Sequence, residues 1–108
     1  MPMPVTLERT PIEGLLVVKT GVFHDARGFF SESHSQMMWR EAGFDAIFVQ
    51  DNLSKSAKGT LRGMHYQIEP AGMGKLVRCL QGAVYDVVVD LRRGSPSYGK
   101  WHGLELSG

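Results

Sequence analysis

The chain has 108 residues, enough for a single domain, residues 1–108, with a modest hydrophobic core. Its hydrophobic content of 43%, charged content of 21% and net charge of +1 are those of an ordinary globular protein with no general attraction to nucleic acid or to an anionic membrane. No apolar run has the length of a membrane span and no signal-peptide core follows the first residues, so the expected location is cytoplasmic.

Three short strands are expected in the first half of the chain. Apolar runs at residues 15–19 and 29–33 have the length and composition of strands, and residues 21–28 between them are typical of a turn. Residues 46–52 form a third run, which is apolar at its start and polar at its end. Residues 54–59 then read as a solvated loop.

One helix is expected between the second and third of these strands. Ser35 is a favoured N-cap residue, and the helix should continue to about Ala42 and end at Gly43. Trp39 within it is expected to pack against other apolar side chains rather than to bind a cofactor.

The central part of the chain contains three further apolar runs, residues 61–67, 74–80 and 84–90. Each run carries one ionisable side chain, and these are His65, Lys75 and Asp86. An ionisable group that points with valines toward a core is costly unless it is paired or lines a cavity. The pattern predicts a polar pocket inside a β-structure, although a solvated lysine at the start of a strand explains Lys75 equally well.

The last part of the chain predicts a turn-rich connection at residues 92–99 and a strand at residues 101–106. Six or seven short strands with a single helix indicate an all-β sandwich or barrel. The last strand would leave a sheet edge that something must cover.

The candidate residues suit proton removal next to a ketone. Histidine, with an unperturbed pKa of about 6.5, can take the proton, so His65 is the candidate base. Lys75 would stabilise the enolate oxygen, and Asp86 would orient the imidazole. The side chains suited to an anionic or hydroxylated substrate are Arg27, Gln50, Asn52 and Arg62.

Arg62 and His65 lie three positions apart, so a regular strand would direct them to opposite faces. Their convergence requires an irregular backbone at Gly63, which we therefore predict. A metal centre is not expected, because a cupin-type site needs two histidines and a carboxylate, and His65 has no histidine two residues on. Cys79 has no cysteine partner and is expected to be a buried structural thiol.

Five motifs resemble one family of enzymes. They are DARGFFSE at 25–32, FVQDN at 48–52, LRGMHYQ at 61–67, GKLVR at 74–78 and YDVVVDLR at 85–92. In this order and register they resemble the dTDP-4-dehydrorhamnose 3,5-epimerases and related deoxysugar epimerases. The resemblance implies a cupin-like jelly-roll β-barrel that works without metal or cofactor, usually as a homodimer sharing N-terminal strands.

The resemblance also implies a reaction, the epimerisation of dTDP-4-dehydro-6-deoxy-D-glucose at C3 and C5 to dTDP-4-dehydro-L-rhamnose. His65 matches the family's base, Lys75 the enolate-stabilising residue, and Asp86 an acidic position near the site. The positions that match nucleotide-sugar contacts are Arg27, Glu32, Gln50, Asp51, Asn52 and Arg62.

The family pattern continues beyond residue 108 through further strands and a tyrosine proton donor, so the barrel is expected to be incomplete at its C-terminus. This pattern fits either a portion of a longer protein or a short relative completed by another chain. Two other functions stay open: a single-position epimerase or ketoisomerase of a related dTDP-sugar, and a non-catalytic nucleotide-sugar-binding β-domain.

Overall fold

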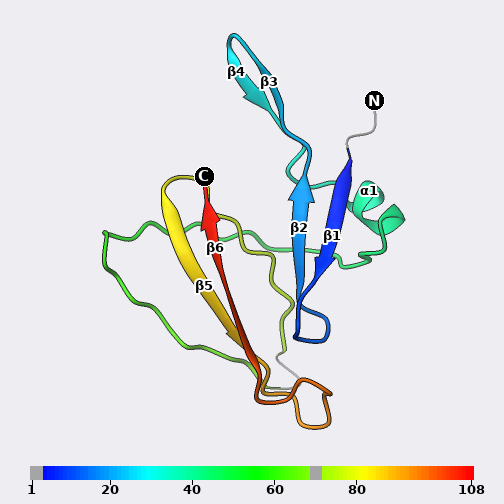
Figure 1. Ribbon diagram of the computed structural model, residues 1–108, viewed down its shortest axis with the longest axis vertical. Helices are drawn as coiled ribbons and strands as arrows, with labels where there is room; N and C mark the ends of the chain where they lie inside the picture. The colour runs from blue at the N-terminus through cyan, green and yellow to red at the C-terminus, as the bar shows by residue number, and fades with distance from the viewer. Residues whose placement is uncertain (1–3, 69–71) are drawn as a thin grey trace.

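A computed structural model describes residues 4–68 and 72–108 (Figure 1). Six strands and one helix follow one another along the chain. They are β1 (Val5–Arg9), β2 (Leu16–Thr20), β3 (Phe23–Asp25), β4 (Gly28–Phe30), α1 (Gln36–Glu41), β5 (Ala83–Val89) and β6 (Trp101–Ser107).

The strands form three antiparallel two-stranded sheets, β1–β2, β3–β4 and β5–β6. Each sheet pairs two strands that follow one another in the order of elements along the chain, and Leu7 lies opposite Val18 in the first sheet and Asp86 opposite Leu104 in the third. In the longest hairpin, Gly103 on β6 leaves room for the ring of Tyr85, because a Cβ at this glycine would overlap the phenol. Figure 1 shows β3–β4 projecting away from the other two hairpins.

Helix α1 forms where the sequence predicts it. The Ser35 hydroxyl accepts a hydrogen bond from the Met38 amide at 3.2 Å and so satisfies one of the free amides of the first turn. Gly43 follows with φ of +107°, a conformation that a side chain would strain, and it ends the helix.

Trp39 anchors this helix in a small aromatic cluster. Its side chain is buried, with 3% of its surface exposed. The indole packs edge-on against His34 at 4.8 Å and against Phe44 at 5.9 Å between ring centroids, and Phe44 stacks on Phe48 at 6.1 Å. The prediction that Trp39 is a packing residue is therefore confirmed.

A second buried region lies where the β1–β2 turn meets the β5–β6 loop. Ile12 is 4% exposed, and the polar side chains of Asp90 and Ser97 are each 3% exposed. All buried polar side-chain atoms in the described ranges have a hydrogen-bond partner.

Three predicted strands, residues 46–52, 61–67 and 74–80, do not form regular strands in the described part of the chain. A strand needs a neighbour to satisfy its main-chain groups, and these extended segments find none among residues 4–68 and 72–108. Their apolar side chains stay exposed, with Val49 and Leu61 both at 92%. The chain is accordingly expanded: its radius of gyration is 15.6 Å, against about 13 Å for a compact domain of this length.

The remaining predictions have mixed outcomes. The strands expected at 84–90 and 101–106 are confirmed as β5 and β6, and the strand at 15–19 as β2. The run at 29–33 contributes only the end of β4, and β1 and β3 were not predicted. Cys79 is half-buried rather than buried, since its segment is unpaired, and its thiol donates to the Gln81 carbonyl at 3.4 Å.

Candidate functional site

The tip of the β3–β4 hairpin carries the first candidate, Arg27. The Asp25 carboxylate accepts hydrogen bonds from the Arg27 amide at 2.8 Å and from Arg27 Nη2 at 2.6 Å. These bonds, with the side-chain bond first, hold the pKa of Asp25 below its ordinary value. The guanidinium nevertheless stays 90% exposed.

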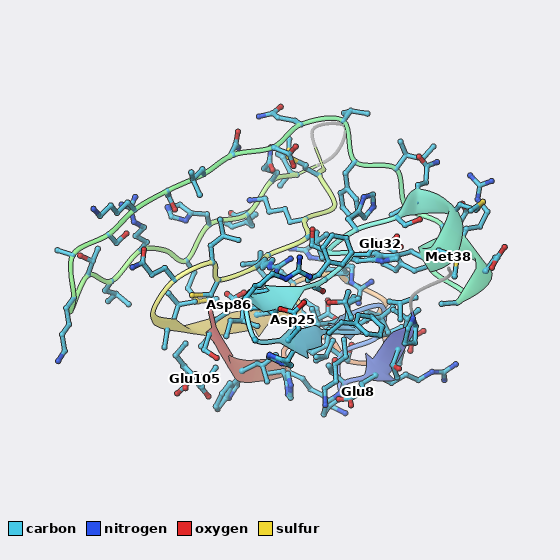
Figure 2. The ribbon with its side chains drawn as sticks, turned by 90° about the horizontal axis from the view of Figure 1, so that it is seen from above. Glu8, Asp25, Glu32, Met38, Asp86 and Glu105 are labelled. Carbon is cyan, nitrogen blue, oxygen red and sulfur yellow. The ribbon has the colours of Figure 1, made fainter. Side chains whose placement is uncertain are left out.

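An open hollow of about 300 Å³ lies beside this pair. Its walls are Asp25, Arg27, Gly28, Phe29 and Phe30. It combines a cation with two exposed aromatic rings, Phe29 and Phe30, and this combination suits a ligand that has both a negative charge and a flat ring. Glu32, half-buried after β4, lies nearer to α1 than Asp86 does (Figure 2).

The second group of candidates lies on the extended segments. Gln50, Asp51 and Asn52 are exposed, and the Gln50 amide donates to Asn52 Oδ1 at 3.2 Å. These two side chains lie two positions apart on the extended backbone, which places them on the same face and lets them contact each other. Arg62 is also exposed, and its Nε donates to the Ser56 hydroxyl at 2.9 Å.

Gly63 has φ of +107° and lies outside any strand, so the irregular backbone predicted there is confirmed. The following imidazole folds back toward it, because a Cβ on Gly63 would lie 3.6 Å from Nδ1 of His65. The irregular glycine therefore gives His65 a direction that a regular strand would not give.

The structure does not bring His65, Lys75 and Asp86 into an enclosed pocket. His65 and Lys75 are exposed, whereas Asp86 is half-buried on β5. No hydrogen bond or ion pair joins these three side chains in the part of the chain that the structure describes. The enclosed polar pocket expected from the sequence is thus a wrong prediction for these residues alone, because two of its three walls were to be strands that have no partner here.

Arg27 also lies apart from Asp86. Figure 1 shows its hairpin, β3–β4, pointing away from β5, which carries Asp86.

In the described ranges, no cluster of three or more His, Cys, Asp or Glu side chains is arranged to hold a metal ion. Nor does any helix in those ranges have the length and apolar character needed to cross a membrane.

Sequence reasoning missed the best-formed polar cluster, which surrounds Asp90. Its carboxylate accepts hydrogen bonds from Arg92, Ser95 and Ser97, and these hold its pKa well below the ordinary range, with Arg92 having the largest effect. A signal was present, since Asp-x-Arg followed by Ser-x-Ser places several short donors just after a strand.

Comparison with known proteins identifies the family. The family model described as dTDP-4-dehydrorhamnose 3,5-epimerase matches residues 9–108. The chain belongs to this epimerase family. It is 55% identical over 100 residues to a dTDP-4-dehydrorhamnose 3,5-epimerase of Shigella flexneri and 54% identical to one of Pseudomonas aeruginosa, each time over 92% of this chain and 55% of the relative. The chain therefore spans about half the length of these epimerases.

Solved structures of the family agree with the fold. The epimerase of Bacillus anthracis, crystallised with TDP and pyrophosphate, matches with a TM-score of 0.91 at 41% identity, over 96% of this chain and 60% of that one. The enzyme of Legionella pneumophila, in complex with dTDP-4-keto-L-rhamnose, matches with a TM-score of 0.88 at 45% identity, over 97% and 56%. The predicted fold class, a cupin-like, mainly β structure with one short helix, is confirmed.

Because these matches cover nearly all of the chain, they include the extended segments. Residues 44–68 and 72–80 therefore follow the path of an epimerase although they are unpaired among the described residues.

Proposed function

We propose that the protein is part of a 3,5-epimerase that converts dTDP-4-dehydro-6-deoxy-D-glucose to dTDP-4-dehydro-L-rhamnose. The observation that carries the proposal is the match of residues 9–108 to the epimerase family, together with 55% sequence identity to one of its members over 100 residues. The named ligand of the Legionella relative supports a dTDP-linked 4-keto sugar as the substrate class.

In this proposal His65 is the base. A C–H bond next to the C4 ketone is acidic because the carbanion that forms is an enolate, and a neutral imidazole can accept the proton at neutral pH. The exposure of His65 leaves the imidazole open to a substrate, and the turn at Gly63 directs it. An acid on the opposite face of the carbon, the tyrosine that the family resemblance implies, would then donate a proton and invert the centre, and His65 would release the proton it took to solvent, so that no electrons are gained or lost overall.

Lys75 would stabilise the enolate oxygen, since an ammonium donates hydrogen bonds to a developing negative charge more strongly than to a neutral ketone. It is exposed in the described structure, so its ammonium is available to a ligand. Asp86 would act from β5 as an orienting carboxylate, and its half-buried position suits a supporting role better than direct attack.

The nucleotide-sugar contacts would come from exposed polar side chains. Arg27, with its 90% exposed guanidinium, is the candidate for the diphosphate, and the neighbouring phenylalanines offer rings to a base. The further proposed contacts are Glu32, Gln50, Asp51, Asn52 and Arg62.

A homodimer is also part of the proposal. Strand β1 pairs on one side with β2, and its other edge pairs with no strand in the described ranges. Free edges of this kind are suited to strand exchange between two copies. The proposal also keeps the cytoplasmic location expected from the sequence, and it adds participation in the synthesis of cell-wall polysaccharide, which the family resemblance implies.

The test follows deuterium entry from D2O into dTDP-4-dehydro-6-deoxyglucose by NMR. Exchange at both C3 and C5 supports the 3,5-epimerase, exchange at one carbon supports the single-position enzyme, and binding without exchange supports a nucleotide-sugar-binding domain. His65→Asn should reduce exchange by about a hundredfold or more, while His102→Asn on β6 serves as the matched control. Full exchange in His65→Asn would remove this histidine as the base.

A further inference from the structure

The Asp90 carboxylate is the centre of a polar cluster that connects two hairpins. Oδ1 accepts from the Arg92 amide at 2.9 Å and from Arg92 Nε at 3.0 Å. Oδ2 accepts from Arg92 Nη2 at 3.1 Å and from the hydroxyls of Ser95 and Ser97, both at 2.6 Å. Five donors thus surround a carboxylate side chain with no exposed surface.

Two of these partners continue to the β1–β2 turn. The Ser97 hydroxyl, which has donated its hydrogen to Asp90, accepts a hydrogen bond from the Glu13 amide at 3.0 Å. Arg92 Nη2 donates to the Glu13 carbonyl. Both main-chain polar groups of Glu13 are therefore hydrogen-bonded to side chains that lie 84 and 79 positions later in the sequence.

The orientation of each partner depends on Asp90. A serine hydroxyl has one hydrogen, and because the carboxylate takes it, the oxygen of Ser97 is left as an acceptor for Glu13. The same carboxylate fixes the guanidinium through Nε and Nη2, which sets the direction of the bond to the Glu13 carbonyl.

The turn presents its main chain to this cluster rather than a side chain. Gly14 has φ of +82°, and a Cβ built on it would lie 3.6 Å from Nη1 of Arg92, so the guanidinium lies directly against the backbone. No strand of β1–β2 pairs with a strand of β5–β6 in the part of the chain described. These contacts are therefore polar links between two hairpins that share no sheet.

We propose that Asp90, Arg92 and Ser97 form a latch that docks the β1–β2 turn on the β5–β6 loop by binding the amide and the carbonyl of Glu13. The latch sets the position of the hairpin that contains the free edge of β1 relative to the hairpin that carries Asp86. It does not depend on the proposed catalytic function, because its contacts lie within the chain.

The experiment measures amide hydrogen exchange by NMR in Ser97→Ala and in its matched control, Ser95→Ala. Both serines donate to Asp90 Oδ2 at 2.6 Å, but Ser97 is the one that also accepts from Glu13. We expect the Glu13 amide to exchange about tenfold faster in Ser97→Ala than in Ser95→Ala, in keeping with the loss of one hydrogen bond. Equal exchange of this amide in the two variants would overturn the latch.

Two further measurements separate the latch from general destabilisation. The Asp90 amide donates to the Lys100 carbonyl at 2.9 Å and reports on closure of β5–β6, so its exchange should change little in Ser97→Ala. Glu13→Gln keeps both main-chain groups and should leave the exchange of residue 13 within about twofold of the parent protein. If Glu13→Gln exchanges as fast as Ser97→Ala, the turn is recognised through its side chain and the proposal fails.

A third variant, Arg92→Lys, covers the case in which Ser97→Ala does not fold. Arg92 is 58% exposed, so this variant should fold. The substitution should shift the carbonyl 13C resonance of Glu13, and an unchanged resonance would count against the latch.

Discussion

Replacing Trp39 by alanine should cost more stability than the removal of other apolar side chains of α1. Trp39 is 3% exposed, and burying an indole removes roughly 150–250 Å² from water. At about 25 cal/mol per Å² this area corresponds to about 4–6 kcal/mol, which is an upper limit because an unfolded chain already hides part of it. Phe44 beside the indole and Phe48, which stacks on Phe44, are themselves half-exposed and can relax into the space. We therefore expect a loss of about 3 kcal/mol in the free energy of unfolding.

The measurement is denaturant unfolding followed by far-ultraviolet circular dichroism, since the fluorescence of the protein changes with the mutation itself. Met37→Ala is the matched control on the same helix, because Met37 is 66% exposed and its loss should change stability by less than about 0.5 kcal/mol. A Trp39→Ala protein within about 1 kcal/mol of its parent, or no more affected than Met37→Ala, would refute the view that this cluster anchors the helix.

Two other predictions concern the cap and the buried carboxylate. Ser35→Ala removes the acceptor for the Met38 amide and should lower the free energy of unfolding by about 1 kcal/mol, whereas Ser33→Ala in the exposed loop before the helix should have little effect in the same denaturant titration. The folded pKa of Asp90 lies below its unfolded value, so the unfolded state binds more protons near and below pH 4 and stability should fall as the pH is lowered through this range. Asp90→Asn should flatten the dependence of the melting temperature on pH between 5 and 2.5 more than Asp25→Asn does, because Asp25 is half-exposed; equal slopes in both variants would contradict this assignment.

Elements whose stability is local were predictable from the sequence. Helix α1 has a capping serine and a terminating glycine within nine residues, and these local signals determine its two ends. The strands β5 and β6 were predictable for a similar reason, because Ala83–Val89 is mainly apolar, Trp101–Ser107 alternates apolar and polar residues, and Gly, Pro and Ser mark the turns between them. Equally strong strand patterns occur at residues 46–52, 61–67 and 74–80, but such a pattern shows only that the backbone prefers an extended conformation. Because these segments have no partner strand among the described residues, they are extended without forming strands.

The candidate site shows the same distinction. The irregularity at Gly63 followed from a local contradiction, namely that Arg62 and His65 cannot share a face of a regular strand. The enclosed pocket required three strands to assemble, which is a long-range property that periodicity does not contain. The Asp90 cluster was missed because its acceptor and donors lie in a loop, where composition indicates turns but not which hydroxyl a carboxylate will bind.

The exposure of Arg27 links the hairpin geometry to the proposed ligand. An ion pair whose guanidinium is 90% exposed contributes little to stability, typically about 0–1 kcal/mol, so Arg27 can change partners at small cost. A diphosphate offers more negative charge than the single carboxylate of Asp25 and accepts the same forked donors. Asp25 meanwhile also accepts the Arg27 amide, which keeps the turn in shape when the guanidinium leaves. Under the proposed function this exposed pair would release its guanidinium to the anion, in contrast to Asp90 and Arg92, whose carboxylate has no exposed surface.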